Sequence, residues 1–133
     1  MPDISSIPET VILADGEYPA EGIPAALLAH ARRVVCCDGA ADAYITRGGR
    51  PAAIVGDGDS IRDATALRFR EVLHIVPDQE TNDLTKAFAF CMEQGYGKIT
   101  ILGATGRRED HTIGNISLLA DYARQAEVQM VTP

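Results

Sequence analysis

Short apolar runs recur along the chain, separated by stretches in which polar and apolar residues mix. Most of the runs are rich in Val and Ile and lack strict alternation of apolar and polar positions. That pattern is typical of strands covered on both faces of a parallel sheet. The sequence therefore predicts six strands, at Val11–Ala14, Val34–Cys37, Ala53–Val55, Val72–Val76, Ile99–Leu102 and Val128–Val131.

Helical patterns fill the stretches between the predicted strands. The clearest begins near Asn82 and ends at Gln94, with apolar residues along one face and Gly95 as a C-terminal stop. Weaker patterns predict helices at Pro24–Ala31, Ala40–Arg47, Ala64–Arg70 and His111–Gln125. Because parallel neighbours need crossover helices, the alternation predicts an α/β fold. We expect a doubly wound, mostly parallel sheet of about six strands with helices on both faces, a Rossmann-like three-layer arrangement.

The composition is that of one ordinary domain. The 133 residues are 46% hydrophobic, and we expect residues 1–133 to form a single α/β domain. A formal net charge of −7 with scattered basic residues argues against a nucleic-acid partner. With no apolar run of about 18 residues and no secretory signal, we expect a cytoplasmic protein and no membrane partner. Cys36, Cys37 and Cys91 fit no zinc or redox spacing and are expected to be buried thiols.

Polar and glycine-rich segments directly follow four of the predicted strands. In an open parallel sheet the loops after the strands converge on one edge, which is where ligands bind. We therefore expect these segments to share one cleft. They are Asp38–Asp42, Gly56–Ser60, Asp78–Asp83 and Gly103–His111.

The segment Gly56–Ser60 carries Asp57 and Asp59 between glycines, so the backbone can aim both carboxylates at one point. Two like charges so close repel each other, and a divalent cation removes that cost. Mg²⁺ is the natural guest, because it takes oxygen ligands and is usually held by one or two carboxylates plus substrate phosphates. An equally valid interpretation of an isolated Asp-Gly-Asp is a tight turn.

Asp83 lies in the first turn of the clearest predicted helix, and Lys86 follows one turn later. Residues three apart share a helix face, so Asp83 is a candidate metal ligand and Lys86 a candidate phosphate contact. The alternatives are a carboxylate that stabilises the helix dipole and a solvated surface lysine.

The segment Gly103–Gly106 lies between a strand and a helix, where backbone N–H groups can bind a phosphate. Arg107 and Arg108 beside it are candidate phosphate partners or ordinary surface residues. Asp38 either lines the cleft or forms a turn. Neither the G-x-x-x-x-G-K-[ST] loop nor G-x-G-x-x-G occurs, and no serine or cysteine nucleophile accompanies His111.

Taken in order, four segments resemble the motif series of the thiamin pyrophosphokinase family: Cys37–Ala41, Gly56–Ser60, Asp78–Ala87 and Gly103–His111. The resemblance implies Mg²⁺-dependent transfer of the β,γ-pyrophosphoryl group of ATP to the hydroxyl of thiamin, with release of AMP. It further implies a homodimer.

The same resemblance assigns roles residue by residue. The metal-binding acids that it implies are Asp57, Asp59 and Asp83. The catalytic residues that it implies are Asp59, Asp83, Lys86 and Arg108, with the general base on Asp59 or Asp83. The nucleotide-binding residues that it implies are Asp38, Gly39, Gln79, Thr81, Asn82, Gly103, Thr105 and Asp110.

The chain departs from the family pattern in two respects. Arg107 stands where the family's last motif commonly has a glycine. The family's C-terminal β-sandwich domain, which helps to form the thiamin site, is expected to be absent from this chain. Two other functions therefore stay open: pyrophosphate transfer to another alcohol such as a hydroxymethylpterin, and a noncatalytic nucleotide-binding module.

Overall fold

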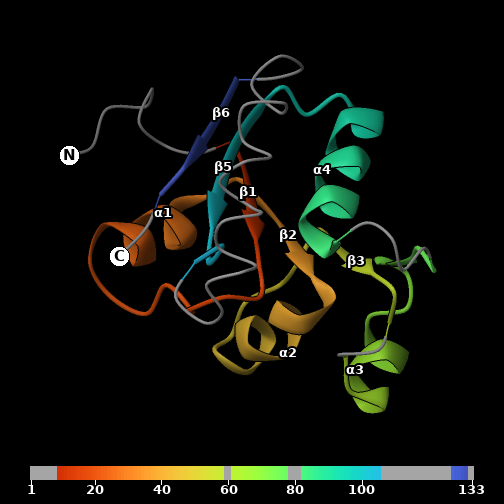
Figure 1. Ribbon diagram of the computed structural model, residues 1–133. Coiled ribbons are helices and arrows are strands. Elements are labelled where there is room, and N and C mark those ends of the chain that lie inside the picture. Colours follow the sequence, from red (N-terminus) through yellow and green to blue (C-terminus); the bar gives the residue numbers. More distant parts are fainter. Residues whose placement is uncertain (1–8, 59–60, 78–81, 106–126, 132–133) are drawn as a thin grey trace.

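The computed structural model describes residues 9–58, 61–77, 82–105 and 127–131. Within them lies one six-stranded sheet, and each predicted strand is present (Figure 1). The strands are β1 (Thr10–Leu13), β2 (Arg33–Cys37), β3 (Ala53–Gly56), β4 (Leu73–Ile75), β5 (Lys98–Leu102) and β6 (Glu127–Met130).

All neighbouring strands in the sheet run parallel, in the order β4-β3-β2-β1-β5-β6. In the middle of the sheet Ile12 of β1 pairs with Val35 of β2 on one side and with Ile101 of β5 on the other. The chain therefore winds outward in one direction from β1 to β4 and then returns to the other side of β1. The strand order reverses between β1 and β5, which is the place where open α/β sheets bind ligands.

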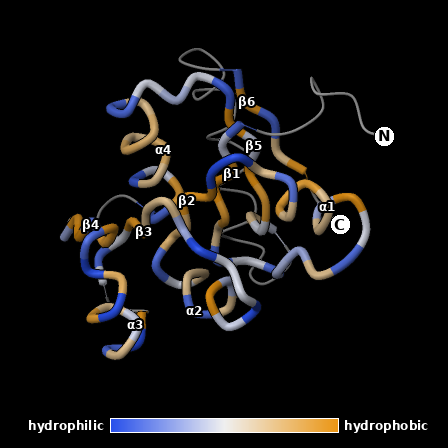
Figure 2. The backbone as a smooth tube through the Cα atoms, turned by 180° about the vertical axis from the view of Figure 1, so that it is seen from behind, coloured by the Kyte–Doolittle hydropathy of each residue, from blue (hydrophilic) through white to orange (hydrophobic). Residues whose placement is uncertain are grey.

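Four helices of the described chain cover the sheet: α1 (Gly22–His30), α2 (Asp38–Thr46), α3 (Asp63–Arg68) and α4 (Asp83–Gln94). One core cluster joins sheet residues such as Ile12, Val35 and Val55 to α4. A second cluster, on the opposite face, joins Val11 and Ile54 to α1 and α2. Helices on both faces confirm the predicted doubly wound fold, and Figure 2 shows hydrophobic segments along the central strands.

Local sequence signals place α4 accurately. The Asn82 side chain accepts a hydrogen bond from the Thr85 N–H at 2.8 Å and so caps the first turn. Gly95 ends the helix in the left-handed conformation, with φ of 79°. Asp83 is therefore fixed as the first residue of the helix.

The start of α2 differs from the prediction. We expected Asp38 and Gly39 in a loop and a helix from Ala40, but α2 begins at Asp38, directly after β2. The negative charge of Asp38 in the first turn interacts favourably with the helix dipole, and this helps the helix to begin at Asp38. The predicted helix at His111–Gln125 lies outside the described residues.

Two further features concern the cysteines and the length of the helices. Cys36, Cys37 and Cys91 are buried free thiols, as predicted. Within the described ranges, no helix is long and apolar enough to span a membrane.

Candidate metal and nucleotide site

Asp38 is the buried centre of the candidate site. It is 0% exposed at the carboxyl end of β2, where its Oδ2 atom accepts a hydrogen bond from the Gly58 N–H at 2.8 Å. Its Oδ1 atom has no hydrogen-bond donor among the described residues. The absence of a side chain at Gly56 makes room for this carboxylate, because a Cβ atom there would lie 2.6 Å from Cγ of Asp38. A buried carboxylate oxygen without a partner is costly unless a cation or donor approaches it.

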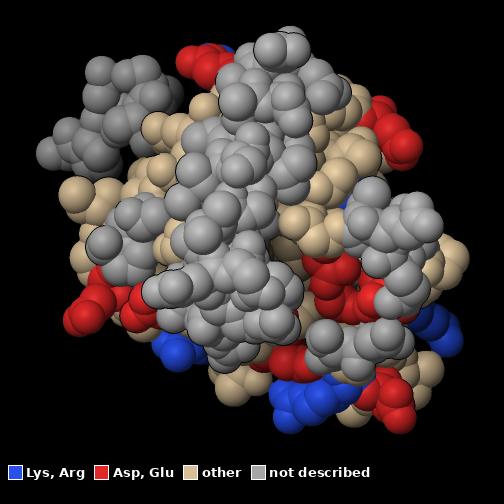
Figure 3. Space-filling view, viewed as in Figure 1, with Lys and Arg blue, Asp and Glu red and all other residues tan. Residues whose placement is uncertain are grey.

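Two more carboxylates approach Asp38 from neighbouring elements. Asp57 follows β3, and Asp83 opens α4, which packs across β1, β2 and β3. One carboxylate oxygen from each of Asp38, Asp57 and Asp83 lies within 4.8 Å of the other two. Acidic side chains gather beside the amino end of α4 (Figure 3). Three oxygen ligands converging from three elements are a suitable donor set for Mg²⁺.

The electrostatics of the cluster are unfavourable without a cation. Burial, a hydrogen bond to Asp38 and the charges of Asp38 and Asp57 raise the pKa of Asp83 to about 7. The nearby Lys86 lowers this pKa but does not offset the other effects. Below about pH 7 the metal-free site therefore keeps a proton on Asp83, and a bound cation would supply positive charge in its place.

The raised pKa predicts how the stability of the metal-free protein varies with pH. In the unfolded chain Asp83 ionises near its ordinary value of 3.8, whereas in the folded protein it stays protonated up to about pH 7. The unfolded state thus loses its proton first, and the stability of the folded state falls as pH rises through this window. Thermal unfolding in a chelator, from about pH 5 to about pH 8, should show this fall in the parent protein and a smaller one in Asp83→Asn. Equal pH dependence in the two proteins would contradict the assignment.

Lys86 lies beside the cluster and is buried. Its side chain is 3% exposed, and its Nζ atom lies 3.9 Å from Oδ1 of Asp83, one helical turn away. The interpretation of Lys86 as a solvated surface lysine is therefore wrong. A buried ammonium next to an acidic cluster is a cationic group available to a phosphate that enters the site.

The loops after β1 and β5 are joined at the same edge of the sheet. The Gly16 N–H donates to the Gly103 carbonyl at 2.5 Å, and the Glu17 N–H donates to the Thr105 carbonyl at 2.8 Å. Gly103 has φ of 71°, a conformation that favours glycine. Gly103 and Thr105, two of the expected nucleotide-binding residues, thus lie where the strand order reverses.

Asp15 is a residue that the sequence analysis missed. It follows β1, and its carboxylate lies against Gly39 in the first turn of α2, where a Cβ atom would collide with it. The signal was available, since Asp15-Gly16 directly follows a predicted strand like the other acidic segments. Gly39 therefore borders a fourth carboxylate at this edge of the sheet.

Some of the expected site residues lie close together in the described part of the chain. Asp38, Asp57, Asp83 and Lys86 come together, and Asn82 caps the helix that carries two of them. Five expected site residues lie outside the described residues: Asp59, Gln79, Thr81, Arg108 and Asp110.

A family model, a relative with a similar sequence and two solved structures all connect this chain with thiamin pyrophosphokinases. A family model described as thiamin pyrophosphokinase, catalytic domain, matches residues 25–132. Thiamin pyrophosphokinase 1 of Caenorhabditis elegans is 35% identical over 78 residues, which is 54% of this chain and 32% of that protein. A solved structure of a probable thiamine pyrophosphokinase from Staphylococcus saprophyticus superimposes with a TM-score of 0.72 and 25% identity, over 92% of this chain and 64% of that one. Thiamin pyrophosphokinase from Geobacillus thermodenitrificans gives a TM-score of 0.71 and 26% identity, over 92% and 58%.

Proposed function

The chain belongs to the thiamin pyrophosphokinase family, whose catalytic domain it matches over residues 25–132, and we propose that it transfers pyrophosphate from ATP to the hydroxyl of thiamin. The products are thiamin diphosphate and AMP. The match to the Caenorhabditis elegans relative spans about a third of that protein, 32% of its length. The complete reaction is therefore a proposal for this chain, and it is argued from the residues of its own site.

The observation that carries the proposal is the carboxylate cluster of Asp38, Asp57 and Asp83. We propose that it holds Mg²⁺. The unpartnered, buried Oδ1 atom of Asp38 supports this, because a bound cation would satisfy it. All three donors are oxygens, which Mg²⁺ prefers. Asp59, two residues after Asp57, belongs to the same proposed ligand set.

The protein's own groups would act by position and charge. When bound, Mg²⁺ supplies positive charge that neutralises the phosphate oxygens of ATP. The Nζ atom of Lys86 lies 3.9 Å from Oδ1 of Asp83, and we propose that it contacts a phosphate oxygen of ATP. Arg108 is proposed to contribute a second cationic contact. The proton of the thiamin hydroxyl would pass to Asp59 or Asp83, the two acids proposed for that role.

The adenosine part of ATP is proposed to lie along the carboxyl edge of the sheet towards β1 and β5. Gly103 and Thr105 mark that end of the edge, and Gly39 lies between it and the carboxylates. This is the position at which an open α/β sheet reverses its strand order. The remaining proposed nucleotide contacts are Gln79, Thr81, Asn82 and Asp110.

An acceptor competition assay tests this function. The protein is incubated with ATP, Mg²⁺ and equal amounts of thiamin and a hydroxymethylpterin, and AMP and the two possible diphosphate products are separated by chromatography. AMP should form with thiamin diphosphate and should need both thiamin and metal. Exclusive transfer to the pterin would overturn the thiamin assignment, and ATP binding without AMP formation would indicate a noncatalytic module.

The wider biological setting is part of the same proposal. Homodimerisation and a cytoplasmic location rest on membership of the family rather than on a contact in this chain. Transfer to a pterin is the less favoured alternative, because the family model and the named relatives all refer to thiamin.

A further inference from the structure

Helix α2 binds the main chain at two points after β3. Asp38 and Asp42 are four residues apart and so lie on one face of the helix. Asp38 accepts the Gly58 N–H at 2.8 Å, and Asp42 accepts the Arg62 N–H at 3.0 Å through its Oδ2 atom. Gly58 directly follows the proposed metal ligand Asp57. One helix face therefore fixes the chain just after that ligand and again four residues later.

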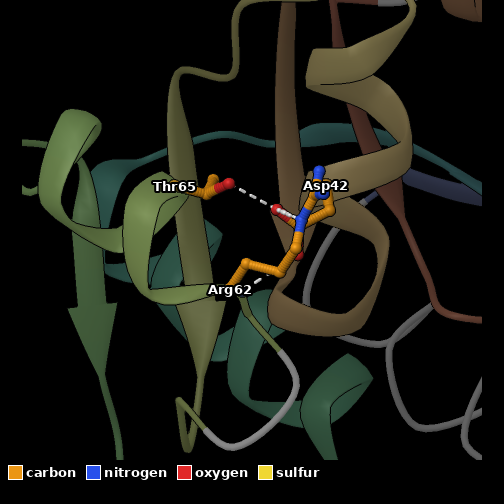
Figure 4. A network of polar contacts seen from close by, with 3 residues as sticks. All are labelled: Asp42, Arg62 and Thr65. Atoms are coloured by element: carbon orange, nitrogen blue, oxygen red, sulfur yellow. Dashed lines mark hydrogen bonds and ion pairs between the residues drawn. The ribbon is translucent and has the colours of Figure 1, made fainter.

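Asp42 also binds the first turn of α3. Its Oδ1 atom accepts a hydrogen bond from the Thr65 hydroxyl at 2.5 Å and lies 3.4 Å from Nε of Arg62 (Figure 4). Arg62 precedes α3 as its N-cap residue and supplies no side-chain cap of its own. The carboxylate of Asp42 thus binds both the N-cap residue and the first turn of α3. Ile61, the residue before Arg62, is buried in the core cluster with Ala40 and Ala41 of α2.

The contacts of Asp42 contribute unequally to the stability of the protein. The Arg62 side chain is 70% exposed, so its ion pair contributes little to stability. The hydrogen bond from the Thr65 hydroxyl is part-buried, whereas the one from the Arg62 N–H is exposed. Both end on a charged acceptor, and such hydrogen bonds are the stronger kind. Burial raises the pKa of Asp42, but the hydrogen bonds from Thr65 and Arg62 outweigh it and hold the pKa below its ordinary value. Asp42 is therefore an ionised acceptor at neutral pH.

We propose that Asp42 is a positioning residue for the proposed metal site: it holds Arg62 and the first turn of α3 against α2, and this helps to keep Asp57 within reach of Asp38 and Asp83. The inference rests on the proposed function, because it assigns a role in forming that site. Asp42 is absent from the carboxylate cluster that would hold the metal, so it acts only through the main chain and through α3. Groups that orient metal ligands typically change metal affinity by about 10-fold to 100-fold when removed.

The test is a calorimetric titration of the parent protein and four variants with Mn²⁺, at a temperature well below unfolding. Three variants change Asp42 or Arg62, and the fourth is a control. Asp42→Ala is expected to weaken cation binding about 10-fold. Asp42→Asn keeps one acceptor oxygen and should weaken it about threefold, which keeps the test valid if the alanine variant does not fold. Arg62→Ala retains the main-chain N–H and should bind within about twofold of the parent.

A control separates positioning from general loss of stability. Thr10→Val removes the hydrogen bond from Nη1 of Arg33 at the opposite edge of the sheet, 2.8 Å long in the parent. This variant should unfold more easily yet bind Mn²⁺ like the parent. If Asp42→Ala and Asp42→Asn bind Mn²⁺ as tightly as Thr10→Val does, the inference is wrong while the proposed function stands. If the parent itself binds no divalent cation, the proposed function and the inference both fail.

Discussion

Asp38→Asn is expected to lower kcat/KM for AMP formation by about 100-fold or more, because it removes one charge from the centre of the proposed metal site. Asparagine has nearly the same shape, and its amide oxygen can still accept the Gly58 N–H that Asp38 binds at 2.8 Å. The loss should therefore come from the missing charge and not from the fold. Steady-state kinetics at saturating and limiting Mg²⁺ measure it.

The stability of this variant distinguishes a metal site from a structural carboxylate. Asp38 is 0% exposed and adjoins two other acids, so its neutralisation should leave the metal-free protein as stable as the parent or more stable. The rise in unfolding temperature on adding Mg²⁺ should be largely lost. Asp63→Asn, at an exposed aspartate in the first turn of α3, is the matched control. Unchanged turnover in Asp38→Asn, or an undiminished response to Mg²⁺, would refute the assignment.

Gly56→Ala is expected to have the second largest effect. The new Cβ atom would lie 2.6 Å from Cγ and 3.0 Å from Cβ of Asp38, so the buried carboxylate must move. Overpacking of a core costs about 1–3 kcal/mol in the free energy of unfolding. Displacement of Asp38 should also lower the rate of AMP formation by about 10-fold or more, since catalytic groups tolerate shifts of only about 0.5 Å.

The control for this prediction is Gly97→Ala. Gly97 is exposed, and a Cβ atom there would meet no atom within 4 Å. Denaturant unfolding and steady-state kinetics of the two variants should show losses in Gly56→Ala alone. If Gly56→Ala is destabilised but as active as the parent, then the exact position of the Asp38 carboxylate is not critical for activity.

Much of the fold could be predicted from the sequence because a covered parallel sheet leaves a strong signal. Strands such as β1 and β3 are buried at every position and appear in the sequence as short runs that are apolar except for Thr10. The ends of α4 were also predictable, since Asn82 and Gly95 are specific cap residues. The weakest strand, β4, is shorter than the predicted Val72–Val76, and its residues are largely exposed at the edge of the sheet.

The candidate site was only partly predictable. Strand order along the chain indicated that Asp57 and Asp83 lie at one edge, but their distance from Asp38 depends on how α4 crosses β2 and β3. The burial of Lys86 likewise comes from packing, because a lysine on a helix face has no local signal for it. Asp42 was expected only as part of the cleft segment Asp38–Asp42 and of a helix. Its role as a partner of Arg62 and Thr65 could not be predicted, because these residues lie 20 and 23 positions away in the sequence.

We propose that this chain moves a pyrophosphoryl group from ATP to thiamin at a metal site built on Asp38, Asp57 and Asp83. Phosphorus NMR of the protein with ATP, Mg²⁺ and thiamin tests it most directly, since each phosphate group is observed separately. AMP and thiamin diphosphate should form in equal amounts, and neither should form when thiamin or Mg²⁺ is omitted. Unchanged ATP, or ADP formed together with thiamin monophosphate, would contradict it.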